Sequence, residues 1–255
     1  MSRPTADLVL DRVCYRPGPL LLDEVTVTFP AGRVTAVAGP SGSGKTTLLS
    51  IAGGLVPPTS GTATYDGAPT WAGNGDPRPE IAFVLQVYGL VPILSARENV
   101  AIALRARGVA WDEANDRAET ALARFDIADL GDRQVEELSG GQRQRVWVAM
   151  VLAQQTPYLL LDEPTTFLDI THQYQLLSLL ARLRDEGRTV VAVLHDINQA
   201  CRFADHLVAM KAGRIVAEGA PRDIVDADLM AEVFDLPSVV IPDPVTGTPM
   251  VVPIT

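Results

Sequence analysis

Residues 39–47 form a stretch whose residue types and spacing can bind phosphate. The stretch reads Gly39-Pro40-Ser41-Gly42-Ser43-Gly44-Lys45-Thr46-Thr47. It follows an apolar run, residues 34–38, that predicts a buried strand. Its glycines permit a tight turn whose backbone N–H groups converge on an anion at the start of the next helix. Lys45 can then reach the β- and γ-phosphates of a nucleotide, and the Thr46 hydroxyl can ligate a bridging Mg²⁺. A plain Gly/Ser turn is the alternative, but it requires neither lysine nor threonine. We call residues 39–47 the phosphate loop.

A pair of carboxylates, Asp162 and Glu163, follows another apolar run, residues 158–161. The run predicts a buried strand that ends at the carboxyl edge of a parallel sheet, where open α/β proteins bind ligands. Successive strand residues point in opposite directions, so the two carboxylates can have different roles. We expect Asp162 to hold Mg²⁺, directly or through water, and Glu163 to orient and polarise an attacking water. The apolar run makes the alternative, a surface pair of acids, a poor explanation.

His195 stands at the end of a further apolar run, residues 189–194. Because that strand ends at the same sheet edge as Glu163, the imidazole is expected to contact a γ-phosphate. A lone histidine is more often structural, and His172 and His206, which lack such a position, are interpreted as ordinary.

Tyr15 lies between two segments, residues 8–13 and 20–29, that predict an antiparallel pair of strands. An aromatic ring just before the phosphate-binding strand can stack on adenine. An ordinary tyrosine at a strand end is the alternative.

Residues 138–142, the signature segment, open a helix predicted to reach about residue 155. Ser139 fits an N-cap, and Gly140 and Gly141 leave the helix start open to an anion. A capped helix without a ligand is the alternative. The signature segment and the phosphate loop both suit phosphate oxygens, yet a predicted helical lobe separates them. A two-fold, head-to-tail pair would let one nucleotide bind Lys45 of one subunit and Ser139 of its partner.

The alternation of buried runs and helices predicts an α/β fold with a mostly parallel sheet and an N-terminal antiparallel β subdomain. We expect residues 1–86 and 138–236 to form this core and residues 87–137 to form an inserted helical lobe. Residues 237–255 would be a tail, with a small hairpin around residues 243–247. With 255 residues, 47% of them hydrophobic, the chain can bury such a core.

Composition excludes several classes of protein. A net charge of -10 argues against a nucleic-acid partner, because binding the nucleic-acid backbone requires a basic face. Two cysteines are too few for a disulfide framework. No apolar run approaches the roughly 18 residues of a membrane span, and no signal-peptide pattern is evident, so we expect a cytosolic chain that reaches a membrane only at its surface.

The order of these motifs resembles the nucleotide-binding subunit of ATP-binding cassette (ABC) transporters, over roughly residues 8–218. In chain order the motifs are the phosphate loop, Gln86, Leu138-Ser139-Gly140-Gly141-Gln142, Leu159-Leu160-Leu161-Asp162-Glu163, Leu168-Asp169 and His195. The resemblance implies a P-loop NTPase core that binds ATP and Mg²⁺, with the signature residues Ser139 to Gln142 on the nucleotide.

The resemblance also implies roles for single residues. Tyr15 would stack on adenine and Glu163 would be the general base. His195 would hold the γ-phosphate. Gln86 would contact Mg²⁺ and the attacking water while sensing a membrane permease, and Asp169 would link two active sites. Helix capping alone would also explain Asp169.

Partners and location follow from the same resemblance. It implies a permease whose cytoplasmic coupling helix docks beside the helical lobe, and a homodimer or a pair with a related cassette. An importer would add a substrate-binding protein. The subunit would be peripheral, on the cytoplasmic face of a bacterial membrane.

Two parts of the chain indicate different cargoes. From about residue 137 onward the sequence resembles importers of iron siderophores, haem or cobalamin, whereas residues 88–100 are more similar to cassettes for lipoprotein release or efflux. We expect import of an iron siderophore, with export or lipoprotein release as the alternative. A soluble cassette that works without a permease is a further alternative. The net charge and the absence of a long linker disfavour such a cassette acting on ribosomes or DNA.

Overall fold

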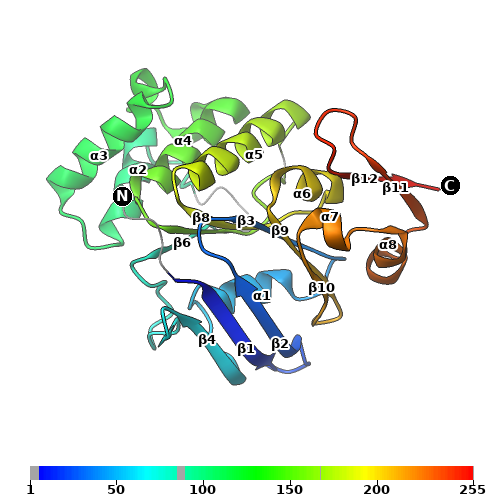
Figure 1. Ribbon diagram of the computed structural model, residues 1–255. Helices are drawn as coiled ribbons and strands as arrows, with labels where there is room; N and C mark the ends of the chain where they lie inside the picture. The colour runs from blue at the N-terminus through cyan, green and yellow to red at the C-terminus, as the bar shows by residue number, and fades with distance from the viewer. Residues whose placement is uncertain (1–5, 85–89, 167, 255) are drawn as a thin grey trace.

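A six-stranded sheet with the order β10-β9-β3-β8-β7-β6 crosses the centre of the molecule (Figure 1). The structure is a computed structural model and describes residues 6–84, 90–166 and 168–254. The strands are β3 (Val34–Ala38), β6 (Ile81–Val84), β7 (Tyr158–Leu161), β8 (Thr189–Val193), β9 (His206–Lys211) and β10 (Arg214–Gly219). All neighbours pair in parallel except β9 and β10, which form an antiparallel hairpin. The predicted α/β fold with a mostly parallel sheet is confirmed.

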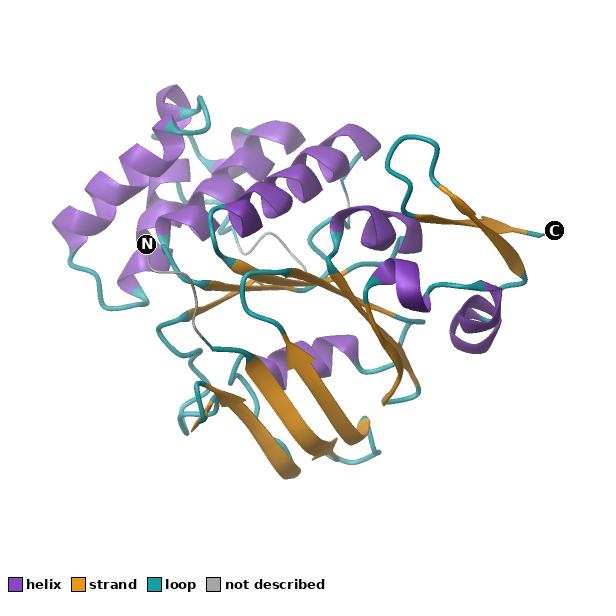
Figure 2. Cartoon of the chain, in the orientation of Figure 1, coloured by secondary structure: helices purple, strands orange, loops and turns teal. Residues whose placement is uncertain are grey.

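Both faces of this sheet are covered, which explains why its strands are continuous apolar runs. Helix α1 (Lys45–Ala52) covers one face (Figure 2). Helices α4 (Gly140–Ala153), α5 (Ile170–Asp185) and α6 (Ile197–Phe203) cover the other. Strand β8 shows the consequence, because Val191 and Val193 pack in the cluster around α1 while Val190 and Ala192 pack in the cluster around the other helices.

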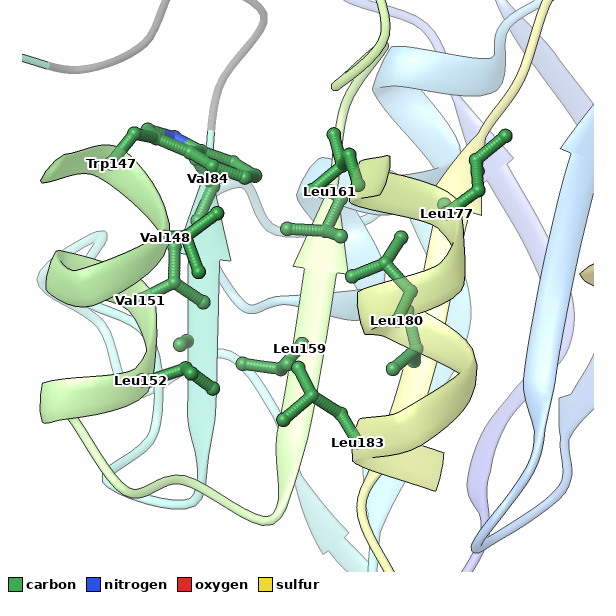
Figure 3. Close-up of a cluster of buried hydrophobic side chains, with 14 of the residues drawn as sticks. Val84, Trp147, Val148, Val151, Leu152, Leu159, Leu161, Leu177, Leu180 and Leu183 are labelled. Atoms are coloured by element: carbon green, nitrogen blue, oxygen red, sulfur yellow. The ribbon is translucent and has the colours of Figure 1, made fainter. Parts of the chain in front are cut away.

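The packing of α4 and α5 on β6 and β7 fixes the edge of the sheet where Asp162 follows. Val84, Leu159 and Leu161 face helix side chains in Figure 3. The facing side chains are Val148, Val151 and Leu152 from α4 and Leu177, Leu180 and Leu183 from α5. Full burial of each such side chain contributes about 1.5–3 kcal/mol, so the end of β7 is held firmly.

A second, antiparallel sheet packs on the outer side of α1 (Figure 1). Its order is β2-β1-β4-β5. The strands are β1 (Leu8–Tyr15), β2 (Leu22–Phe29), β4 (Ser60–Tyr65) and β5 (Ala68–Pro69). The predicted antiparallel pairing of the first two strands is confirmed. The predicted bounds differ, because β1 continues to Tyr15 rather than ending at residue 13 and β2 begins at Leu22 rather than at residue 20.

Two helices, α2 (Ala96–Arg105) and α3 (Trp111–Ala123), lie at the far end of the molecule and pack against α4. Short 3-10 helices at Ala128–Leu130 and Val135–Glu137 complete this part. Helix α2 begins with a capping box, since the Ser95 hydroxyl accepts from the Glu98 N–H and the Glu98 carboxylate accepts from the Ser95 N–H.

The C-terminal part consists of α7 (Pro221–Ile224), α8 (Ala227–Phe234) and the predicted hairpin, β11 (Ser238–Pro242) with β12 (Pro249–Pro253). Asn198 of α6 holds the hairpin, because its side chain accepts from the Val251 N–H at 2.7 Å and donates to the Val251 carbonyl at 3.2 Å. Within the described ranges, none of the helices is long and apolar enough to cross a bilayer.

The two cysteines differ in environment, which gives a test of the packing around α6. Cys201 is 1% exposed, and burial raises the pKa of its thiol to about 12. Cys14 is only partly buried. Because the thiolate is the reactive form, a thiol reagent at pH 8 should modify Cys14 in the native protein and Cys201 only after unfolding. Counting labelled thiols by mass spectrometry with and without denaturant checks this. Rapid native labelling of Cys201 would contradict the packing.

Candidate nucleotide site

The phosphate loop connects β3 to α1 and has backbone angles that need glycine. Gly42 and Gly44 have φ of 77° and 97°. Gly39 has φ of 155°, and a Cβ there would lie 2.2 Å from the Met210 carbonyl oxygen. A Cβ on Gly44 would lie 2.8 Å from Leu22 Cδ2. The loop is therefore a tight cradle pressed against β9 and the start of β2.

The polar groups of the cradle are those a phosphate requires. Helix α1 begins after Gly44 with no side-chain cap, so its first N–H groups face the loop. The Ser43 hydroxyl is buried and has no hydrogen-bond partner among the described residues. The buried Lys45 ammonium donates to the carbonyls of Gly39 at 2.9 Å and Pro40 at 2.8 Å. The residues present thus fit an anionic ligand that supplies the missing acceptors.

Asp162 lies beside Thr46, as the predicted metal site requires. The Thr46 hydroxyl donates to Asp162 Oδ1 at 3.2 Å, and Asp162 is 2% exposed. Burial raises the pKa of the Asp162 carboxyl, although the Thr46 hydrogen bond and the charge of Lys45 oppose this. Burial likewise lowers the pKa of Lys45, against the charges of Glu163 and Asp162. A hydroxyl and a carboxylate are oxygen ligands of the kind Mg²⁺ prefers, so the pair fits that ion.

Glu163 is brought to His195, as expected from the shared sheet edge. His195 Nε2 lies 2.7 Å from Glu163 Oε1, and the Thr166 hydroxyl donates to the other carboxylate oxygen at 3.4 Å. The expected reason for the different directions of Asp162 and Glu163 is wrong, however. Strand β7 ends at Leu161, and Glu163 has φ of 51°, a left-handed turn that costs about 1–3 kcal/mol in a residue with a Cβ. A turn, not strand alternation, separates the two carboxylates.

Tyr15 is the last residue of β1 and pairs with Leu22 of β2. Leu22 is also the side chain nearest to Gly44 of the phosphate loop. The tyrosine is therefore linked to the phosphate loop through Leu22, which pairs with it and contacts the loop at Gly44. The ring is partly exposed, as stacking on a ligand requires.

The signature segment lines a different cavity, of about 650 Å³. Ser139 caps α4, where it accepts from the Gln142 N–H while the Gln142 side chain accepts from the Ser139 N–H. Gly140, Gly141 and Asp169 line the same cavity. None of the phosphate-loop residues lines it. Within the described chain, the predicted residues thus fall into two separate groups, one around Lys45 and one around Ser139.

Gln86 lies outside the described residues. Asp169 caps α5, where it accepts from the His172 N–H at 2.9 Å, and its second oxygen lies 2.7 Å from His172 Nδ1. The hydrogen bond from the His172 backbone, and after it the one with the His172 side chain, lower the pKa of the Asp169 carboxyl. The carboxylate still lines the signature cavity, so capping and a ligand contact are compatible.

His172 is the residue that sequence reasoning missed. The sequence indicates an ordinary histidine, yet the side chain lines the signature cavity and contacts both Asp169 and Gly141. A histidine three positions after a helix-capping aspartate was the available signal, because that spacing puts both side chains on one face of the first turn.

Comparison with known proteins agrees with this geometry. The family described as ABC transporter matches residues 22–166. The ferric enterobactin transport ATP-binding protein FepC of Escherichia coli K12 is 44% identical over 91% of this chain and 88% of its own length. The probable siderophore transport system ATP-binding protein YusV of Bacillus subtilis is 42% identical over 92% of this chain and 87% of its own.

A solved structure shows the same fold. The ATP-binding cassette MJ0796, in a dimeric post-hydrolysis state bound to ADP and Pi, superposes with a TM-score of 0.73 and 34% identity. The match covers 84% of this chain and 98% of that one.

Asp162 supplies a test of the site's electrostatics. The raised pKa of Asp162 means that the folded state binds the proton more tightly than the unfolded state does. The free energy of unfolding therefore falls as the pH rises through the folded-state pKa and the carboxyl ionises. Asp162→Asn should therefore raise the Tm of the nucleotide-free protein at pH 7, by about 2–4 °C if the net gain is ~1 kcal/mol. The gain should vanish at low pH, where the wild-type carboxyl is protonated.

Calorimetric scans across pH measure this effect, and nucleotide titration with and without Mg²⁺ provides the functional readout. The variant should lose the tightening of ATP binding by Mg²⁺. A Tm that falls at pH 7 would show that the carboxylate is net stabilising and would contradict its assignment as a desolvated group.

Proposed function

Because this chain belongs to the ABC transporter family, we propose that it is the ATP-hydrolysing subunit that powers import of an iron siderophore through a partner membrane permease. As an ABC ATP-binding subunit it is an ATPase. One observation supports the assignment of single residues most strongly: Lys45, Thr46 and Asp162 meet beside the Glu163–His195 pair at one sheet edge. A match over 91% of the chain must also include most of residues 87–137, which favours import over release or efflux for the helical insertion as well.

The phosphates of ATP bind in the phosphate loop, with Tyr15 stacked on the adenine. Lys45 exchanges its two carbonyl acceptors for the β- and γ-phosphate oxygens. Thr46 and Asp162, with Gln86, would hold Mg²⁺, which neutralises charge on the phosphates when bound. His195 would turn from Glu163 to the γ-phosphate. The Glu163 carboxylate would orient a water and accept its proton as the water oxygen bonds to the γ-phosphorus and the bond to the ADP oxygen breaks.

Each site is completed by a second subunit. The signature residues Ser139 to Gln142 and Asp169 line a cavity of their own, apart from Lys45, so they are free to meet a nucleotide held elsewhere. A head-to-tail pair places them on the ATP of the partner. The solved relative of similar fold is described as a dimer, which supports this arrangement. The second subunit is an identical copy or a related cassette. Loss of the γ-phosphate then opens the pair.

The subunit would work at the cytoplasmic face of a bacterial membrane, with a permease and a substrate-binding protein as partners. Several similar proteins are named for ferric enterobactin, petrobactin and hydroxamate transport, and this shared chemistry supports an iron chelate as cargo.

Glu163→Gln tests the proposed chemistry. The amide keeps the size of the side chain but cannot accept the proton of water, so turnover should fall by about 100-fold or more. ATP binding should persist, and an ATP-bound dimer should accumulate on a sizing column. An ATPase rate close to that of the wild type would show that Glu163 is not the general base.

The cargo is tested by reconstitution. The subunit should be purified with candidate permeases from siderophore, haem and lipoprotein-release systems, each in lipid vesicles. We expect a siderophore permease, with its loaded binding protein, to stimulate ATPase activity several-fold. Stimulation by an efflux or lipoprotein-release permease alone would contradict the import proposal while leaving the ATPase assignment intact.

A further inference from the structure

His172 connects the two elements that would reach the partner's nucleotide. Its ring Nδ1 lies 2.7 Å from Asp169 Oδ2, and its backbone N–H donates to Asp169 Oδ1. A Cβ built on Gly141 would lie 2.5 Å from His172 Nε2, so the imidazole is packed directly on that glycine. One ring thus contacts the carboxylate at the start of α5 and the backbone at the start of α4.

The backbone at His172 is tied to the same helix. The side chain of Gln144, which is 4% exposed, donates to the His172 carbonyl at 3.0 Å. Ring and carbonyl therefore hold the first turn of α5 against the first two turns of α4. Because Gln144 is buried, this second tie fixes the distance between the helices and leaves the ring to set the position of Asp169.

The neighbouring Gln173 holds the segment before Asp169 from the other side. It donates to the carbonyls of Thr165 and Leu168, and its oxygen accepts from Gln199 of α6 at 2.7 Å. Gln173 therefore links the backbone of Thr165 and Leu168 to α6. His172 supplies the restraint on the signature side.

We propose that His172 is a positioning residue that holds Asp169 and the signature segment as one unit, so that both meet the partner's ATP together. The inference rests on the proposed function, because it assumes a nucleotide shared between two subunits. Without the ring, Asp169 keeps its capping bond to the backbone but loses its tie to α4. The Gln144 bond to the backbone of residue 172 would remain, but dimer closure would then have to order the Asp169 carboxylate separately from the signature segment, which weakens the dimer. Nucleotide binding in the phosphate loop of a single subunit should not change.

The test uses Glu163→Gln as the parent, since it should trap the ATP-bound dimer. We would compare the parent with His172→Ala, His172→Asn and Ser178→Ala added to it, and measure the ATP-dependent dimer dissociation constant by analytical ultracentrifugation. His172→Ala should weaken the dimer by about tenfold, as expected for loss of a coupled contact. His172→Asn keeps a donor near Asp169 and should recover part of the loss. Ser178, an exposed residue farther along α5, is the matched control and should leave the dimer unchanged.

Binding of ATP to the monomer, measured by fluorescence at protein concentrations below dimerisation, separates positioning from general damage. The inference predicts unchanged monomer affinity and an unchanged Tm for His172→Ala. Dimer affinity within about twofold of the parent would overturn it, as would an equal loss of monomer binding. If the Glu163→Gln parent itself fails to dimerise with ATP, the proposed function fails first. If the parent dimerises and His172→Ala does so equally well, only the inference about His172 fails.

Discussion

The parallel sheet is the constraint on which the site depends. Strands β3, β7 and β8 are buried along their whole length, and their pairing in parallel brings their carboxyl ends to one edge. The phosphate loop and the Asp162–Glu163 pair directly follow β3 and β7, and His195 follows β8 after one intervening residue. Their mutual distances are therefore set by backbone pairing and by the apolar packing on both faces of the sheet, rather than by the polar groups themselves.

The same architecture explains why one chain holds its candidate ligand residues in two separate groups. Helix α4 begins at the signature segment and packs its apolar side chains on the sheet and on α2 and α3, so Ser139 lies on a different cavity from Lys45. Bringing both groups to one nucleotide within a single chain would require α4 to leave the core. In the proposed pair, a second subunit would meet the requirement without that cost, since rigid bodies need only approach each other.

Features set by local pattern could be predicted from the sequence. Buried strands, the capped start of α4, the phosphate loop and the C-terminal hairpin follow from hydrophobic periodicity, capping residues and glycine spacing. Two features could not. The left-handed turn at Glu163 depends on the surroundings that stabilise an unfavourable backbone angle. The residue type at position 163 does not predict such an angle. The contact of His172 with Gly141 joins helices separated by β7, so no local spacing reveals it.

The shared site is tested most directly by a crystal structure of the Glu163→Gln variant with ATP and Mg²⁺. The account predicts two nucleotides at an interface, each with its γ-phosphate contacted by Lys45 of one subunit and by the Ser139 hydroxyl of the other. A structure in which Lys45 and Ser139 of a single chain grip the same ATP, with no second subunit at the site, would contradict it.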